Sequence, residues 1–487
     1  MRVRYAVAVA VLWLAGCYPV NPPLARYDPD GGYRYQRLQE PDPKNGEETL
    51  VILTFSGGGT RAAAFAYGVL SELRRTPAGP GRTLLDEVDV ISSVSGGSFA
   101  AAYLGLFGQD VFFHDFKDAV LYRKLERALI LRVLAPWNWP RLLSPRFSRA
   151  DLAAEYYDHA IFRGKVFSQL PNHRPFIVLN ATDITEGAVF SFTQEHFDRL
   201  CSDLGPVHVA RGVTASSAFP VAFPPLTLKN YPKKTCAYAA PLWVVNATAG
   251  DFESNPPRFR LAAIWHSYED AAIRHFVHLS DGGLADNIGL RAPMDALVLS
   301  DGWGLDAKVN DGVVKRIVVI VVDAKPKPAS PIDRTPTAPG IYHVLNAAAT
   351  NPMENYSADT VELLRKHFEE WRQDAAGYDR RRDRCDRLAA ATCGTNAACR
   401  TRHARACDDT FAATPDLAPP HPRLHRIHVR FEAIPDPAAR LQLEQVDTRL
   451  ELSHEQVDEL IDWGARLLRE SPEFQNLVGE LRELGTP

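Results

Sequence analysis

Runs of apolar residues along the chain predict a series of buried strands. Residues 49–55 (TLVILTF) are short, β-branched and apolar throughout, which is typical of a strand buried on both faces of a parallel sheet. Residues 316–324 (RIVVIVVDA) show the clearest pattern of this kind, whereas residues 426–434 (RIHVRFEAI) alternate and predict an edge strand. Further strands are predicted at residues 88–91, 175–183, 188–193 and 275–280.

A glycine-rich turn and a helical pattern follow each of the first two predicted strands. The turn at residues 56–61 (SGGGTR) precedes AAAFAYGVLSELRR, in which apolar residues recur at helical spacing. The turn SVSGGS, at residues 93–98, precedes a second helix start at residues 99–107. Because strand, turn and helix alternate twice, the pattern predicts an α/β layered fold.

The last part of the chain predicts mainly helix. Residues 365–416 are charged, contain cysteines and show no strand pattern, which indicates a helical insertion. Ser453-His454-Glu455-Gln456 resembles a capping box, in which the serine and the glutamine cap the first turn of the helix VDELIDWGARLLRE. We therefore expect C-terminal helices that complete the domain after the insertion.

Residues 121–145 (LYRKLERALILRVLAPWNWPRLLSP) form an unusual segment, because arginines alternate with leucines and two tryptophans lie on a Pro-Trp-Asn-Trp-Pro turn. Basic residues beside tryptophan and leucine are typical of an interfacial segment or lid among lipid head groups. A helix packed on the core, followed by a loop, explains the same pattern. The sequence leaves both interpretations open.

Composition narrows the class of protein. The chain has 487 residues, of which 46% are hydrophobic and 23% charged, and its formal net charge is -4. This is the composition of a globular protein with a substantial core, and it lacks the basic field that nucleic acid binding needs. Nucleic acid is therefore excluded as a main partner.

The N-terminus predicts export and lipidation. Arg2 and Arg4 precede the apolar run YAVAVAVLWLAG, which is too short for a spanning helix and is typical of a signal peptide over residues 1–16. The run ends in Leu-Ala-Gly-Cys17, which resembles the lipobox of bacterial lipoproteins, where the cysteine is lipidated and becomes the first mature residue. A plain secretory peptide and a buried apolar segment are the alternatives.

Residues 17–45 are expected to form an extended tether after the lipidated cysteine, because they are rich in proline and glycine. Tyr18 occupies the position where an aspartate is associated with inner-membrane retention, so we expect the outer membrane of the bacterial cell envelope.

Export places the remaining cysteines in an oxidising compartment, where they are expected to form disulfides. The four late cysteines are symmetrically placed, so nested bridges would staple a helical hairpin around the turn GTNAA. A metal site is the weaker interpretation, because these spacings lack the close CxxC pairs of structural zinc. The candidate disulfide cysteines are Cys201 and Cys236, Cys385 with Cys407, and Cys393 with Cys399.

Ser95 is the candidate nucleophile. Small residues around it allow a sharp turn from strand to helix, as in a nucleophile elbow, and the following helix N-terminus favours developing negative charge. Gly57, Gly58 and Gly59 can bring backbone N–H groups close to a substrate oxygen, which makes them the candidate oxyanion hole. A phosphate-binding loop is the competing interpretation, but the full GxxxxGK[ST] pattern is absent.

A nucleophilic serine also needs a base, and no histidine has a distinctive context among the 15 present. Asp281, in HLSDGGLADNIGL, follows a predicted strand and precedes two glycines, so it could approach Ser95 across the sheet. A simple turn gives the same Asp-Gly-Gly pattern. Asp286 and Asn287 are either supports of this loop or surface turn residues.

These motifs together resemble the patatin-like phospholipases, over roughly residues 48–325. SGGGTRA resembles the family's oxyanion loop, SVSGG its GxSxG serine motif and DGG its Asp-Gly-Gly/Ala motif. Residues 180–192 (NATDITEGAVFSF) and 215–225 (ASSAFPVAFPP) are similar to further family segments. One departure is Ser93, which occupies the position of the first glycine of GxSxG.

The resemblance implies a three-layer α/β/α fold with a mainly parallel sheet and a dyad in which Asp281 is the base for Ser95. It also implies cleavage of acyl esters, mostly of glycerophospholipids, through an acyl-enzyme intermediate, without a metal or other cofactor. The expected organisation is a catalytic domain at residues 46–350, a cysteine-bearing helical insertion at 351–424, and an edge strand with C-terminal helices at 425–487. A catalytically silent lipid-binding or scaffold lipoprotein, and an esterase for lysophospholipids or neutral esters, are the alternatives.

Overall fold

The computed structural model describes residues 21–145, 147–171, 173–220, 222–299, 304–305, 309, 313–326, 336, 338–413 and 422–484. The predicted signal peptide and the predicted lipidation site Cys17 lie outside the described residues.

A single large sheet forms the centre of the fold. Within the described ranges it has eight strands, in the order β10-β9-β1-β4-β5-β8-β7, with β6 paired to β5. The parallel strands are β1 (Thr49–Phe55), β4 (Val88–Val94), β5 (Phe176–Asp183), β9 (Arg316–Asp323) and β10 (Arg423–Arg430). The antiparallel strands are β6 (Ala188–Ser191), β7 (Leu226–Lys229) and β8 (Phe276–Asp281).

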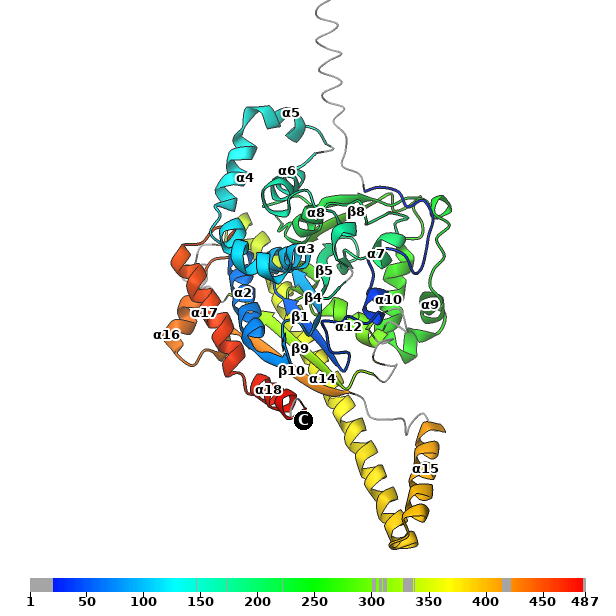
Figure 1. Ribbon diagram of the computed structural model, residues 1–487. Helices are drawn as coiled ribbons and strands as arrows, with labels where there is room; N and C mark the ends of the chain where they lie inside the picture. The colour runs from blue at the N-terminus through cyan, green and yellow to red at the C-terminus, as the bar shows by residue number, and fades with distance from the viewer. Residues whose placement is uncertain are drawn as a thin grey trace, which may run out of the picture.

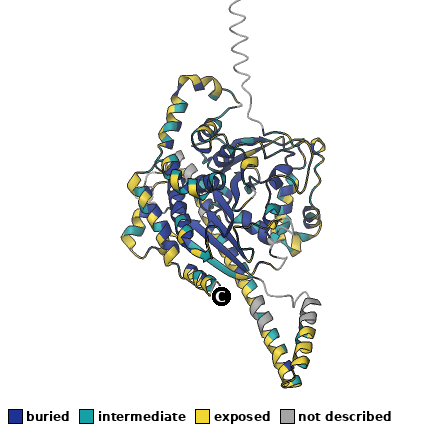
Figure 2. Ribbon diagram, viewed as in Figure 1, coloured by how far each residue is buried: buried dark blue, intermediate teal, exposed yellow. Residues whose placement is uncertain are grey.

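Helices cover both faces of this sheet (Figure 1). One face carries α2 (Gly59–Arg75), α3 (Gly96–Phe116) and α17 (His454–Glu470), and α17 packs along α2. On the other face lie α12 (Arg291–Met294) and the first part of α14 (Ile341–Cys393). The buried strands form the dark central layer in Figure 2. The expected three-layer α/β/α fold with a mainly parallel sheet is confirmed.

The remaining elements lie around the three layers or extend from them, and a small hairpin pairs β2 with β3. Their bounds are β2 (Pro77–Gly79), β3 (Arg82–Thr83), α4 (Leu125–Leu134), α5 (Trp139–Leu142), α6 (Arg149–Tyr157), α7 (Gln194–Asp198), α8 (Val209–Ser216), α9 (Leu242–Ser254), α10 (Pro256–Ser267), α11 (Gly283–Asp286), α15 (Ala397–Ala413), α16 (Pro437–Glu444) and α18 (Pro472–Leu484).

The predicted strands are present, with shifted ends. β4 extends to Val94, three residues beyond the apolar run, and β10 begins at Arg423 and ends at Arg430. β10 lies at the edge of the sheet as expected. The sequence pattern missed β7, because its four residues (LTLK) are too short to establish a period. The capping box at Ser453 is confirmed, since its side chain accepts from the Gln456 N–H at 3.2 Å.

The expectation of an extended tether is wrong for residues 21–45, because this segment packs on the domain. The Tyr33 side chain is buried, and its ring stacks on Phe176 with 4.5 Å between the centroids. The Tyr33 hydroxyl also donates to the Ile177 carbonyl at 3.1 Å. Arg34 forms a buried ion pair with Asp198 at 3.0 Å. Aromatic residues among the prolines and glycines give this segment enough apolar surface to bind the core.

The helical insertion is a long hairpin stapled by disulfides. α14 and α15 project from the body, and their outer turns are largely exposed (Figures 1 and 2). The structure joins Cys385 to Cys407 and Cys393 to Cys399, which is the nested arrangement predicted around GTNAA. A third disulfide joins Cys201 to Cys236 within the body. No described helix is both long enough and apolar enough to cross a membrane.

Candidate active site

Ser95 lies on a strained turn between β4 and α3. Its backbone has φ 49° and ψ −118°, a conformation that residues with a Cβ seldom adopt. The next two residues must be glycines. A Cβ on Gly96 would overlap the Gly59 carbonyl, and a Cβ on Gly97 would lie 2.6 Å from the Phe55 Cβ. This packing matches the geometry of a nucleophile elbow and leaves the Ser95 side chain partly exposed.

Ser93, the departure from the GxSxG pattern, is accommodated without backbone strain. It belongs to β4, pairs with Leu179 of β5 and has an ordinary φ. Its buried hydroxyl lies 3.1 Å from the Ser98 hydroxyl and donates to the Val178 carbonyl at 3.3 Å. The elbow therefore requires glycine after the nucleophile, whereas a hydrogen-bonded serine fits two residues before it.

Asp281 ends β8, the strand that pairs antiparallel with β5. Its side chain is 2% exposed, and its Oδ1 accepts the Gly283 N–H at 2.8 Å. Burial raises the pKa of Asp281 to about 6, while hydrogen bonds from the Gly283 N–H and the Ser95 hydroxyl act in the opposite direction. The structure thus brings the two predicted residues together, with a carboxylate whose pKa is shifted toward neutrality.

A network of hydroxyl groups holds the elbow from below. The Ser95 N–H donates to Ser216 Oγ at 2.9 Å, and Ser216 Oγ donates to the Asn180 carbonyl at 2.6 Å. Ser98 Oγ lies 2.9 Å from the same Ser216 oxygen. The sequence marked the segment that contains Ser216 but did not show this contact, because it joins residues 121 positions apart.

The glycine loop beside Ser95 differs from the expectation at one residue. The Gly57 N–H donates to the Asn287 carbonyl at 2.8 Å, so it anchors the loop and is already occupied. Gly58 and Gly59 lie at the N-terminus of α2, where the first amides of a helix have no carbonyl partner in the helix. Among the described residues no side chain caps this end. The geometry thus leaves Gly58 and Gly59 as the candidate oxyanion donors and excludes Gly57.

Arg61 is a residue whose role the sequence did not reveal. Its side chain is fully buried, and it donates to the Ala324 carbonyl at 2.8 Å and to Thr448 Oγ1 at 3.0 Å. Burial lowers the pKa of Arg61 to about 10, which keeps the guanidinium charged at neutral pH. It lies directly under Gly58, so it ties the glycine loop to the end of β9 and the C-terminal segment. A lone arginine in an apolar helical run was the available signal.

Asp286 and Asn287 support the loop after Asp281. Asp286 is buried and accepts the Arg291 N–H at 2.6 Å and the Ile288 N–H at 3.3 Å. The Asn287 carbonyl accepts the hydrogen bond from the Gly57 N–H. A Cβ on Gly57 would overlap the Asn287 side-chain oxygen. The sequence left open whether Asp286 and Asn287 support the loop or are surface turn residues. The structure shows that both support the loop.

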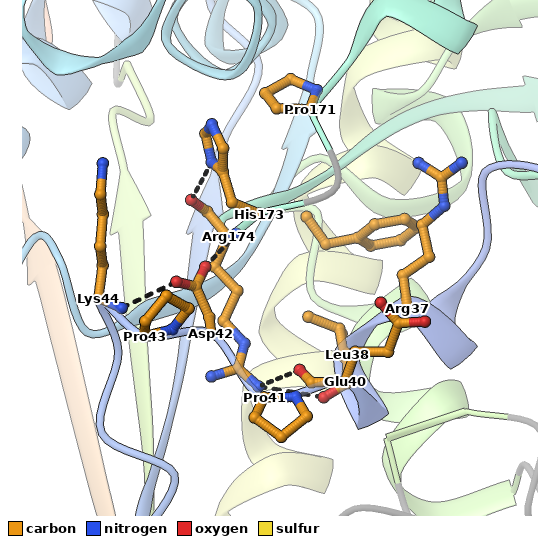
Figure 3. Close-up of a pocket in the computed structure, with 11 residues that line it drawn as sticks. Arg37, Leu38, Glu40, Pro41, Asp42, Pro43, Lys44, Pro171, His173 and Arg174 are labelled. Atoms are coloured by element: carbon orange, nitrogen blue, oxygen red, sulfur yellow. Dashed lines mark hydrogen bonds between the residues drawn. The ribbon is translucent and has the colours of Figure 1, made fainter.

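A cavity of about 360 Å³ lies away from this site (Figure 3). It is lined by Phe176, the first residue of β5, and by Arg174 just before it, so it lies at the amino ends of the parallel strands. Ser95 follows the carboxyl end of β4, the end where α/β folds bind ligands. Arg174 is held by Glu47, Asp89 and Asn45, which indicates a structural role.

Comparison with known protein families agrees with the motifs. Residues 53–294 match the family model of the patatin-like phospholipases. Among solved structures the chain is similar to human GIVD cytosolic phospholipase A2, with 14% identity and a TM-score of 0.41 over 92% of this chain and 64% of that chain. The same human protein in complex with methyl gamma-linolenyl fluorophosphonate gives 12% identity and a TM-score of 0.35, over 98% of this chain and 64% of that chain.

The chain spans about 64% of the length of that human protein. No curated protein matches the chain. The family resemblance read from the sequence motifs is confirmed by the family model, whose matched range contains the glycine loop, Ser95 and Asp281. Over residues 53–294 the chain therefore carries a domain of the patatin-like phospholipase family.

Proposed function

We propose that the protein is a serine acyl-ester hydrolase that cleaves the acyl chains of phospholipids with Ser95 and Asp281. The proposal rests on the contact between Ser95, which is strained and partly exposed, and the buried Asp281 carboxylate, whose pKa is raised to about 6. A base with a pKa near the working pH is an efficient proton acceptor. The helix N-terminus at Gly58 and Gly59 adds donors for an oxyanion.

The reaction proceeds in two steps, acylation of Ser95 and hydrolysis of the acyl-enzyme. Ser95 Oγ attacks the acyl carbonyl carbon while its proton moves to the Asp281 carboxylate, and the N–H groups of Gly58 and Gly59 hold the oxyanion. Collapse expels the alcohol, which takes the proton from Asp281 and leaves an acyl ester on Ser95. Water then attacks this ester, passes a proton to Asp281 and releases the fatty acid, and Asp281 returns the proton to Ser95 Oγ.

The proposed substrate class is membrane phospholipid, with lysophospholipids and neutral esters as alternatives. The proposed location is a membrane face of the bacterial cell envelope, with the outer membrane favoured, to which lipidated Cys17 anchors the protein. Support comes from the lipobox pattern in the sequence and from the family of the catalytic domain. An enzyme held beside a bilayer meets its insoluble substrate without having to extract it first.

The test is fatty-acid release from mixed phospholipid vesicles by residues 17–487 carrying Cys17→Ser, which contain every described element. We expect release that disappears in Ser95→Ala and in Asp281→Asn. Labelling by a fluorophosphonate should follow the same pattern for Ser95→Ala, because it requires an activated serine. Release by Ser95→Ala at the unsubstituted rate would refute the proposal. Absence of both release and labelling would favour a silent lipid-binding lipoprotein.

A further inference from the structure

An exposed apolar lobe extends from the body at residues 121–145, here called the α4–α5 lobe. It contains α4 and α5, and it stands at the upper end of the molecule in Figure 1. α4 buries Leu125 and Leu129, and it packs against α6. The expectation of a helix packed on the core is thus met by one face of α4 only.

The α4–α5 lobe exposes a set of large apolar side chains, some of which line a hollow between the lobe and α6. Ile130, Leu131 and Leu134 lie on one side of α4 and are 51%, 58% and 62% exposed. Beyond the helix, Trp137 and Leu143 are 77% and 83% exposed. Large apolar side chains that gather on one exposed projection indicate a contact surface, whereas single exposed ones are ordinary.

The tip of the lobe is held in shape by its own hydrogen bonds. The buried Asn138 donates through Nδ2 to the Arg132 carbonyl at 2.8 Å, and its N–H donates to the Ala135 carbonyl at 3.0 Å. Trp139 donates through Nε1 to the Val133 carbonyl at 3.2 Å. These bonds fix the turn that carries the exposed Trp137, so this exposure is part of the fold.

The charge of the lobe is opposite to that of the chain. Residues 121–145 carry five basic residues and one acidic residue, whereas the whole chain has a formal net charge of -4. Two of the basic groups lie over aromatic rings, with Arg132 4.2 Å from the Tyr156 centroid and Arg141 3.9 Å from the Phe147 centroid. Arg141 is also paired with Glu155. Lys124 and Arg127 add charge near the start of α4, where they suit anionic head groups.

The N-terminal segment limits how far the body can stand from a membrane. The chain is already fixed to the body at Asn21, whose Nδ2 donates to Ser202 Oγ at 2.9 Å and to the Lys229 carbonyl at 3.0 Å. A lipid on Cys17 would be separated from Asn21 by four residue steps, which reach at most about 14 Å. The described chain also begins near the upper end of the molecule, the end that carries the lobe (Figure 1).

We propose that the α4–α5 lobe is a second membrane contact, which inserts its apolar tip among the lipids of an anionic phospholipid bilayer. This inference rests on the proposed function for the lipid anchor at Cys17. The lobe packs on α6, α6 packs on α8, and the last residue of α8, Ser216, binds the Ser95 amide. Insertion of the lobe therefore orients the catalytic end of the sheet relative to the bilayer that contains the substrate.

The experiment measures binding separately from hydrolysis. Residues 17–487 with Cys17→Ser and Ser95→Ala are mixed with vesicles of phosphatidylethanolamine and phosphatidylglycerol, and bound protein is separated by sedimentation. We expect Trp137→Ser/Leu143→Ser to weaken binding by about tenfold or more, since two large side chains no longer leave water. The matched control is Leu388→Ser on the distant hairpin, where an exposed leucine should contribute nothing. Lipids brominated on the acyl chains should quench tryptophan fluorescence more strongly when Trp137 is present than in Trp137→Ser/Leu143→Ser.

The same lobe variant with Ser95 intact should hydrolyse a soluble short-chain ester at the unsubstituted rate, which shows that it is folded. Vesicle binding unchanged by the lobe variant would overturn the inference, and so would a dimer that this variant dissociates without any effect on vesicles. Failure of the proposed function is distinguishable, because it appears as loss of Ser95-dependent turnover whatever the binding result.

Discussion

Removing the charge of Asp281 should stabilise the protein while it abolishes activity. Burial shifts the pKa of this carboxyl from 3.8 to about 6, so the folded protein resists its ionisation. A shift of roughly two units corresponds to about 3 kcal/mol of folding free energy at neutral pH. The variant Asp281→Asn keeps an oxygen that can accept the Gly283 N–H but carries no charge, so it avoids this cost.

The sign of the effect sets its pH window. Below about pH 4 both the folded and the unfolded chain hold the proton, and the cost is absent. Between about pH 4 and pH 6 the unfolded chain loses the proton first, so the stability of the unsubstituted protein falls as pH rises. Above about pH 6 the full cost remains, and Asp281→Asn removes it.

Thermal unfolding of the two proteins from pH 4 to pH 8 measures this difference. With an unfolding entropy of about 2.1 cal/mol/K per residue over roughly 470 residues, 3 kcal/mol raises Tm by about 3 °C. We expect this gap near pH 7 and none near pH 4. Asp462→Asn, at an exposed position of α17, is the control and should show no gap. A gap that is constant with pH, or Asp281→Asn less stable throughout, would refute the buried-carboxylate reasoning.

Four further results are expected. The kcat/KM of the unsubstituted enzyme should fall tenfold per pH unit below about pH 6 and stay level above it, because only ionised Asp281 accepts the Ser95 proton; a flat profile down to pH 4.5 would contradict this. Gly96→Ala should abolish activity and lower Tm, since its Cβ overlaps the Gly59 carbonyl; normal turnover would show that the loop relaxes. Cys201→Ser/Cys236→Ser opens a loop of 35 residues and should cost about 4 kcal/mol in urea unfolding, whereas an unchanged midpoint would mean that packing alone closes the loop. Arg61→Lys should lower kcat more than it raises KM, because one ammonium cannot replace the hydrogen bonds that the guanidinium makes to the Ala324 carbonyl and Thr448 Oγ1. A variant with normal kcat and unchanged stability would show that Arg61 does not position the glycine loop.

The proximity of Ser95 and Asp281 was predictable because each residue lies in a local sequence pattern. Ser95 and Asp281 each follow a predicted strand and precede two glycines, so the local sequence indicates a sharp turn at each residue. The role of Gly57 was not predictable, because the occupation of its N–H depends on the Asn287 carbonyl. Ser216 and Arg61 act through partners far away in the sequence, which no local pattern records.

The fold shows the same division between local and long-range information. Apolar runs such as residues 49–55 and 316–324 predicted their strands closely, because strands buried on both faces leave a continuous signal. Residues 21–45 were misinterpreted, because proline and glycine content suggested a free tether while Tyr33 and Arg34 had partners elsewhere in the chain. The composition of a segment describes only that segment, whereas its burial depends on contacts with residues elsewhere in the chain.

The long helix α14 connects the candidate site to the disulfide-stapled tip of the hairpin. Met353 lies beside Gly283, close to the Asp281 carboxylate, and the same helix continues to Cys393 at the stapled tip. Forty residues at about 1.5 Å each separate these points by roughly 60 Å. A fluorophore placed on the turn at Gly394 would therefore report the height of the catalytic centre above a labelled bilayer without touching the chemistry.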